Sequence, residues 1–194
     1  MNEKPASVEE KIISATIDCI EKHGISGATN RRIAAAAGVN LAAINYYFRS
    51  KDALIQRVIE ITLKNAFDLG DMEPMPGLPA QERCIAIFAD LLEGGLHYPG
   101  ITRAHFHKLL VDGQYDALLV ARINRFSDDL ALDLHARGSA LEMDELKVAL
   151  MQIFSAVIMA LLAPTLFERQ PQANLHDPDA RRAYVTRLVS RLLG

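Results

Sequence analysis

Two very short helical segments, joined by only three residues, constrain the fold of this chain more than any other feature of its sequence. Residues 30–37 and 41–48 have helical periodicity, and Gly38-Val39-Asn40 connects them. A helix of about eight residues is not stable alone, so both segments need a longer helix to brace them. Residues 7–23 provide such a helix. We therefore predict a helix-turn-helix, an arrangement whose second helix enters the major groove of DNA.

Local signals predict where these helices begin and end. A polar residue that can cap a helix N-terminus precedes each of the first four helices: Ser7 (with Glu10 as a capping box), Thr29, Asn40 and Ser50. Gly38 is expected to end the second helix with a positive φ. The small core of the first three helices is predicted from apolar residues at helical spacing: Ile13, Ile17, Ile20, Ile33, Ala37, Val39, Ile44 and Phe48.

The rest of the chain has the same periodicity, and no stretch alternates as a strand does. We predict an all-α fold of about nine helices, with an N-terminal three-helix domain (1–50), a connecting helix (51–69) and a C-terminal helical domain (70–194). The Pro- and Gly-rich stretch 70–79 indicates a connector. The later helices are expected near 80–96, 102–112, 115–137, 142–167 and 178–193.

Composition excludes several classes of protein. Half of the 194 residues are apolar, which is enough to form a core. Two cysteines, Cys19 and Cys84, are too few for a disulfide framework, and we expect both to pack in the core. Residues 1–10 lack the apolar segment of a signal peptide. Both observations lead us to expect a cytoplasmic protein. The longest apolar stretch, 148–163, is shorter than the roughly 20 residues of a membrane span and predicts a buried helix and no membrane partner.

The charge is unevenly distributed along the chain. Residues 1–65 hold nine Lys and Arg against seven Asp and Glu, whereas residues 66–194 hold twelve against seventeen. Residues 29–57 contain one acid, Asp52, and five basic residues: Arg31, Arg32, Arg49, Lys51 and Arg57. A small basic zone on an acidic body is typical of a protein that binds a polyanion at one end only.

The helix at 41–48 has an unusual outward face. When Val39, Ile44 and Phe48 point inward, the remaining residues point outward or sideways: Leu41, Ala42, Ala43, Asn45, Tyr46 and Tyr47. Asn can read an adenine edge, and Tyr can bind phosphate while its ring packs on a sugar or a thymine methyl group. Lys51 stands in the first turn of the next helix, where the helix dipole disfavours a cation, so a nearby phosphate would explain its position.

Plainer interpretations of the same residues remain open. Tyr47 can equally be a core residue that packs against the first helix. Tyr46 is favoured as a DNA contact, although it can pack against that helix too. Arg32 can be a solvated surface charge, and Lys51 can pair with Asp52 or with another acid nearby.

One combination of residues identifies a family. The run Thr29-Asn30-Arg31-Arg32-Ile33-Ala34, followed by Ala37-Gly38-Val39 and by Tyr47-Phe48-x-x-Lys51-x-x-Leu54, resembles the TetR family of bacterial transcriptional regulators. The preceding Glu21-Lys22-His23-Gly24 matches the end of that family's first helix, and the strong resemblance covers about residues 8–60. The resemblance implies a homodimer whose N-terminal domain binds double-stranded operator DNA and whose C-terminal domain binds a small-molecule effector.

The resemblance also implies which residues contact DNA. By position these are Thr29, Arg31, Leu41, Ala42, Ala43, Asn45, Tyr46, Tyr47 and Lys51. The chain departs from the family at three of them: members commonly carry a polar or basic residue in place of Leu41, Gly in place of Ala42 and Tyr in place of Asn45. These departures leave few polar groups for reading bases.

The function expected from this resemblance is that of a repressor, released from a palindromic operator by a small hydrophobic or aromatic effector. We expect no catalytic activity and no cofactor, and association with the bacterial nucleoid. The alternative is a DNA-associated structural factor that has the same DNA-binding domain but no effector. A closed and filled C-terminal core would favour that alternative.

Candidate effector contacts are apolar, aromatic and basic residues of the C-terminal domain, most of which can equally be core: Phe88, Leu92, His97, Arg103, Phe106, Leu110, Phe126, Met151 and Phe154. His97, His105, His107 and Asp112 suggest a metal site. His105 and His107 lie about 200° apart on a helix, so they cannot bind one ion, and we predict no metal site. One of these histidines can instead line a pocket.

The long apolar helix near 141–167 and the last helix also predict a subunit interface. The first is apolar on nearly every side and therefore needs cover on every side. The last helix has one apolar stripe formed by Tyr184, Val185, Leu188, Val189 and Leu192, with arginines elsewhere. Pairing both with their two-fold mates would form a four-helix dimer interface.

Overall fold

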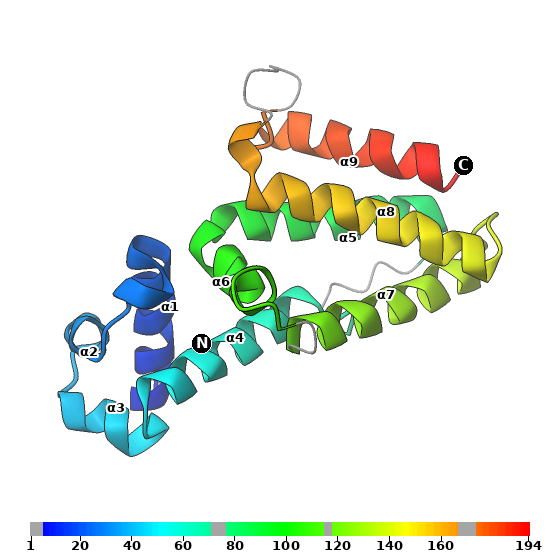
Figure 1. The fold of residues 1–194 in the computed structure, drawn as a ribbon. Coiled ribbons are helices and arrows are strands. Elements are labelled where there is room, and N and C mark those ends of the chain that lie inside the picture. The colour runs from blue at the N-terminus through cyan, green and yellow to red at the C-terminus, as the bar shows by residue number, and fades with distance from the viewer. Residues whose placement is uncertain (1–5, 71–76, 115–117, 167–173) are drawn as a thin grey trace, which may run out of the picture.

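The computed structural model describes residues 6–70, 77–114, 118–166 and 174–194, and in these residues it contains helices and no strand (Figure 1). The all-α prediction is confirmed. The helices are α1 (Val8–Gly27), α2 (Asn30–Ala37), α3 (Leu41–Phe48), α4 (Lys51–Ala66), α5 (Ala80–His97), α6 (Pro99–Leu110), α7 (Leu118–Ala136), α8 (Met143–Leu162) and α9 (Pro178–Leu192), with a 3₁₀ turn at Pro164–Leu166. Figure 1 shows α1–α3 grouped at one end, α5 and α7–α9 at the other, and α4 leading between them.

The predicted N-terminal caps are confirmed. The Ser7 hydroxyl accepts a hydrogen bond from the Glu10 amide while the Glu10 carboxylate accepts one from the Ser7 amide. The other capping side chains each accept a hydrogen bond from the amide three residues on: Thr29 from Arg32 (3.4 Å), Asn40 from Ala43 (2.8 Å) and Ser50 from Ala53 (3.1 Å). Gly38 ends α2 with φ 66° and ψ 32°, the left-handed conformation that the turn requires.

Some helix ends differ from the prediction. The sixth helix begins at Pro99 rather than at 102, because proline fits the first turn, where no helical partner for its amide is needed. The eighth ends at Leu162, two residues before Pro164, and continues only as a 3₁₀ turn. The fourth ends at Ala66 rather than at 69. The predicted starting residues of the seventh helix, 115–117, Phe167 and most of the connector 70–79 lie outside the described residues.

The first three helices enclose a small core to which α4 and α6 also contribute. Ile12, Ile20, Ile33, Ile44 and Leu54 are fully buried there, and Ile101 of α6 packs against them. Ile13 and Ile17 were expected in this core, but they are only half-buried. The reason is that the buried face of α1 runs through Ile12, Ala15, Thr16, Cys19 and Ile20, one residue out of phase with the predicted stripe.

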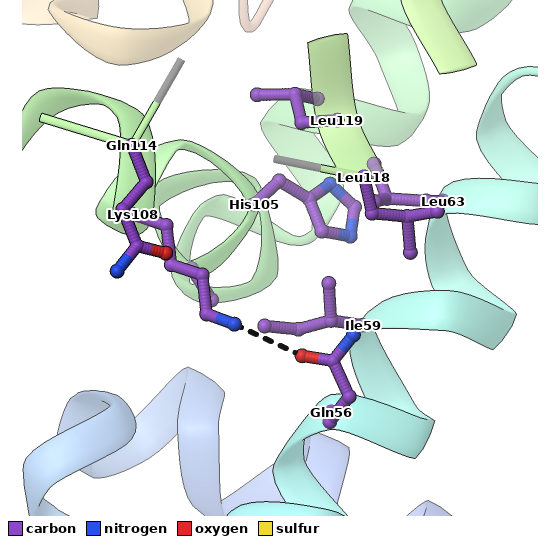
Figure 2. Close-up of a pocket in the computed structure, with 9 residues that line it drawn as sticks. Gln56, Ile59, Leu63, His105, Lys108, Gln114, Leu118 and Leu119 are labelled. Carbon is purple, nitrogen blue, oxygen red and sulfur yellow. Dashed lines mark hydrogen bonds between the residues drawn. The ribbon is translucent and has the colours of Figure 1, made fainter. Parts of the chain in front are cut away.

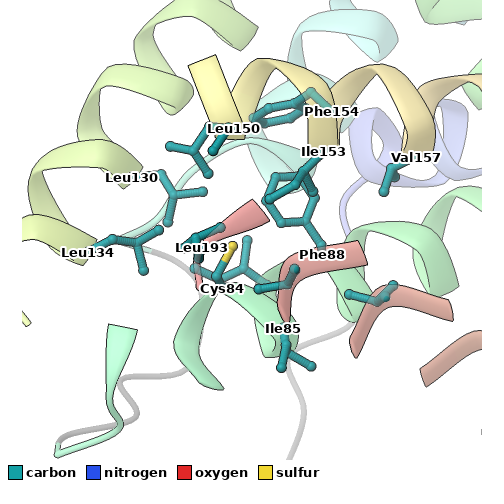
Figure 3. Close-up of a cluster of buried hydrophobic side chains, with 14 of the residues drawn as sticks. Cys84, Ile85, Phe88, Leu130, Leu134, Leu150, Ile153, Phe154, Val157 and Leu193 are labelled. Atoms are coloured by element: carbon teal, nitrogen blue, oxygen red, sulfur yellow. The ribbon is translucent and has the colours of Figure 1, made fainter. Parts of the chain in front are cut away.

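A second, larger core lies among α5, α7, α8 and α9 (Figure 3). Phe88 packs edge-on against Phe154, with ring centroids 4.8 Å apart, and Phe126 packs edge-on against the same ring. Cys84 is fully buried beside them, and burial raises the pKa of its thiol to about 12. Cys19 is buried in the first core, so the prediction that both cysteines are core residues is confirmed.

Helix α8 is not buried on every side. By length and hydropathy alone Met143–Leu162 could span a bilayer, but seven of its side chains are buried inside the protein. The opposite side exposes Val148, Met151 and Met159. Within one chain the prediction of a buried helix therefore holds for one side, and the exposed side is the one that the predicted dimer interface would cover. In α9, Val185 and Val189 are buried as predicted.

Candidate nucleic-acid interface and effector cavity

The outward face of α3 carries polar and aromatic side chains on a short, well-anchored helix. Ile44 and Phe48 hold α3 in the core, which leaves Asn45, Tyr46 and Tyr47 exposed. Tyr46 is 81% exposed and Tyr47 43%, and their rings meet edge to face at 5.1 Å. Tyr46 therefore does not pack against α1 as one interpretation allowed. Leu41 and Ala42 are exposed on the first turn, and Ala43 is half-buried against the core.

The basic residues around α3 differ in their bonding. Arg31 is exposed at the start of α2, whereas the Arg32 guanidinium donates a hydrogen bond to the Gly27 carbonyl oxygen at 2.8 Å. Lys51 is half-buried in the first turn of α4. Arg49 ends α3 with φ 65°, so the chain turns sharply between α3 and Lys51. The face can thus offer cations and hydroxyls to a phosphate backbone on either side of an exposed α3.

A cavity of about 540 Å³ lies between α1, α4 and α6 on one side and the helices of the larger core on the other. Its wall comes from α1, α4, α5, α6 and α8. Phe67, Phe106, Phe154 and Leu161 make the wall largely apolar, and Ser14, Thr62 and Asn65 add polar groups. The volume lies within the range of roughly 300–1,000 Å³ that is usual for small-molecule sites.

Two of the nine predicted effector contacts, Phe106 and Phe154, line this cavity. The other seven do not line it. Phe88, Leu92 and Phe126 are core side chains, because their helical phase points them into the packed interior. The remaining four are exposed on the far sides of their helices: His97, Arg103, Leu110 and Met151.

His105 is the histidine that the fold places on the cavity wall. Its Nε2 lies 2.7 Å from the Thr62 hydroxyl on α4, and burial lowers the pKa of its imidazole to about 4. It also lines a second hollow of about 240 Å³ between α4, α6 and α7, where Lys108 donates a hydrogen bond to the Gln56 side chain at 3.1 Å (Figure 2). His107 points elsewhere, and its Nδ1 lies 3.8 Å from an Asp112 carboxylate oxygen. Within the described residues no group of three metal-binding side chains occurs.

Helix α6 joins the cavity to α1 and α4. The Glu21 carboxylate on α1 accepts hydrogen bonds from the amides of Gly100 (2.9 Å) and Ile101 (2.6 Å) and so caps the N-terminus of α6. Gly100 allows this approach, because a Cβ there would lie 2.7 Å from the Glu21 Cα. Through His105 the same helix is bonded to α4. Any displacement of α6 by a molecule in the cavity would act on both α1 and α4.

Sequence reasoning missed the α1 and α4 side of the cavity. Ser14, Ile17, Asp18 and Thr62 stand in segments that the sequence assigns to DNA binding or to the connecting helix. No local pattern indicates that they line a cavity, because their position depends on how α1 packs against α6.

Comparisons with known proteins agree with this arrangement. A sequence model described as bacterial regulatory proteins of the TetR family matches residues 12–58. The chain is 26% identical over 113 residues to the probable HTH-type transcriptional regulator YttP of Bacillus subtilis, a match that covers 55% of this chain and 52% of that protein. It is 30% identical over 130 residues to the nucleoid occlusion factor SlmA of Glaesserella parasuis, covering 64% and 61% respectively.

Likeness extends to the whole fold. A crystal structure of a TetR transcriptional regulator from Legionella pneumophila matches all of this chain and all of its own, with a TM-score of 0.70 and 20% identity. At that identity the likeness shows the fold alone. The chain spans less than two thirds of the length of the curated relatives named above.

Proposed function

Since the chain belongs to the TetR family of bacterial regulatory proteins, we propose that it is a transcriptional repressor that binds a palindromic operator as a homodimer and is released by a small apolar effector. The observation that carries this proposal is the α6 junction. One helix lines the cavity and is bonded to both α1 and α4, and α4 in turn contacts the DNA-binding α3.

The proposed DNA contacts divide into two groups. Thr29, Arg31 and Lys51 would bind phosphates on either side of the groove, where their contribution does not depend on sequence. Leu41, Ala42, Ala43, Asn45, Tyr46 and Tyr47 would face the groove. Of these, Asn45 has the chemistry to read an adenine edge in two hydrogen bonds.

Effector release would be a population shift. A ligand in the cavity that favours one position of α6 changes the separation of the two DNA-binding helices in a dimer, and couplings of about 1–3 kcal/mol are typical. We assign DNA binding to residues 1–50, connection to helix 51–69, and effector binding and dimerisation to residues 70–194. The contribution of α1 to the cavity wall makes the two parts interdependent.

A structural role on DNA is the second candidate, since one relative is a nucleoid occlusion factor. The size of the cavity argues against it, because a factor without an effector would be expected to fill its core. In the role that we propose, the protein has no catalytic activity, needs no cofactor and acts in the cytoplasm on the bacterial nucleoid.

The test is fluorescence anisotropy of the purified protein on DNA from upstream of its own gene, at low and near-physiological salt, against scrambled competitor. We expect saturable binding that resists the competitor. In parallel, the protein would select sites from a random DNA pool, which covers operators located elsewhere. Failure of the pool to enrich any palindrome, together with salt-sensitive binding to every DNA, would overturn the proposal of a repressor.

A further inference from the structure

The charged side chains on the wall of the effector cavity are carboxylates. Asp18 comes from α1 and Asp90 from α5, and within the described residues no Lys or Arg lines the cavity. His105, the remaining ionisable base on the wall, is held neutral near pH 7, because burial lowers the pKa of its imidazole to about 4. The charge that the wall offers at its α1 edge is therefore that of the Asp18 carboxylate, which disfavours an anionic ligand there.

Asp18 is positioned to meet a ligand. It is exposed on the face of α1 that borders the cavity, next to Ser14, one turn earlier on the same helix. None of the ion pairs among the described residues involves Asp18. Lys22, one turn later, does not line the cavity. A positively charged group of a ligand at the α1 edge of the cavity would therefore meet the Asp18 carboxylate.

The rest of the cavity wall is largely apolar and aromatic. Phe106 and Phe154 supply rings from α6 and α8, Phe67 supplies one from the residue after α4, and Tyr98 adds a fourth from the residue between α5 and α6. Such a wall binds hydrocarbon, and the faces of aromatic rings also attract a cation within about 6 Å. The cavity thus combines an apolar interior with a negative edge.

We propose that the effector is an amphiphilic amine, whose hydrocarbon or aromatic body lies among the phenylalanine rings and whose ammonium group contacts Asp18. This inference rests on the proposed function, since it names the ligand class of the same cavity. Asp18 belongs to α1, one turn before Glu21, which caps α6. The charged end of the ligand would therefore bind to the DNA-binding part of the protein itself, and the apolar end to the C-terminal part.

The test uses three ligands that share a ten-carbon chain and differ in charge: decylamine, 1-decanol and decanoate. Each would compete at pH 7 with the neutral fluorescent probe N-phenyl-1-naphthylamine for the full-length protein without DNA. We expect decylamine to bind about fivefold more tightly than decanol, the ratio that one exposed ion pair supplies, and decanoate to bind most weakly. Asp18→Asn should remove the preference for the amine while leaving the affinity of the probe unchanged.

Glu9→Gln is the matched control, because Glu9 is an exposed acid of α1 that does not line the cavity. It should leave all three affinities unchanged. Equal binding of decanoate and decylamine, or a preference for the amine that survives Asp18→Asn, would overturn the ligand class and leave the effector cavity intact. Failure of the probe and all three ligands to bind would overturn the proposed effector function itself.

Discussion

Lys51 and the outward side chains of α3 should affect DNA binding in different ways. Lys51→Ala removes one cation from a phosphate contact, so we expect weaker binding to every DNA sequence and a salt slope smaller by about 1. The control is Lys11→Ala, because Lys11 is an exposed lysine on α1 that is remote from α3 in the sequence. The measurement is anisotropy across a salt series, and an unchanged slope for Lys51→Ala would remove this residue from the interface.

Asn45→Ala and Tyr46→Ala should instead change which sequences are bound. Both side chains are exposed on α3, and loss of a base contact costs about 1–3 kcal/mol at that position. Binding to a set of operators with single base changes would locate the relaxed position. If neither these two substitutions nor Lys51→Ala altered specific binding, the proposed orientation of α3 on DNA would be wrong.

His105 should make folding stability depend on pH. Its pKa is about 4 in the folded protein, below the ordinary value of 6.5, so the unfolded chain binds more protons between these values. The stabilising contribution is therefore complete above pH 6.5 and decreases as the pH falls toward 4, by about 2 kcal/mol between pH 7 and pH 5. Urea unfolding at both pH values would measure it. His105→Gln should show a smaller loss over the same interval, and equal losses in the two proteins would contradict the assignment.

At the scale of the helix, the features that the sequence predicts are those decided within a few residues. The caps at Ser7, Thr29, Asn40 and Ser50 each depend on a side chain and an amide three residues away, so local reasoning finds them. The turn at Gly38 depends on one residue that can adopt a left-handed conformation, which the sequence also indicates. The buried face of α1 depends on which neighbours it packs against, and its phase was missed by one residue. The cavity wall was missed for the same reason, since Asp18, Thr62 and Phe154 come to line one cavity only in the folded chain.

The junction between α1 and α6 gives a prediction about whole elements. Gly100→Ala would place a Cβ 2.7 Å from the Glu21 Cα and 2.9 Å from the Ile20 carbonyl oxygen, both backbone atoms that cannot turn aside. We expect a loss of about 1–3 kcal/mol in the free energy of unfolding. Gly94→Ala is the control, because a Cβ there meets nothing within 4 Å and alanine favours the helix by up to about 1 kcal/mol. Urea denaturation of both variants would test it, and a neutral Gly100→Ala would mean that α1 and α6 can separate freely.

For the whole molecule, the exposed side of α8 is the surface that we expect a dimer to bury. An apolar strip runs along this helix, and no described segment of the chain covers it: it consists of Val148, Met151 and Met159. Helix α9 lies beside α8, and its Tyr184 hydroxyl donates a hydrogen bond to the Ala156 carbonyl oxygen at 3.5 Å. A second copy of the chain would bury this strip across a two-fold axis and place two α3 helices about 34 Å apart, the spacing of successive major grooves.

Met151→Glu should therefore separate the subunits. Two-fold symmetry brings the new carboxylates toward each other in an apolar interface, where such like-charge contacts cost several kcal/mol, so we expect dimerisation at least about a hundredfold weaker. Leu110→Glu is the control, since Leu110 is 64% exposed against 62% for Met151 but lies on α6. Sedimentation velocity would measure the mass, and anisotropy on a full palindrome and on a half-site would measure binding. The Met151→Glu protein should lose its preference for the palindrome and keep its weak binding to the half-site, because α3 and its supporting core are unchanged. A Met151→Glu protein that remained dimeric would place the subunit interface elsewhere.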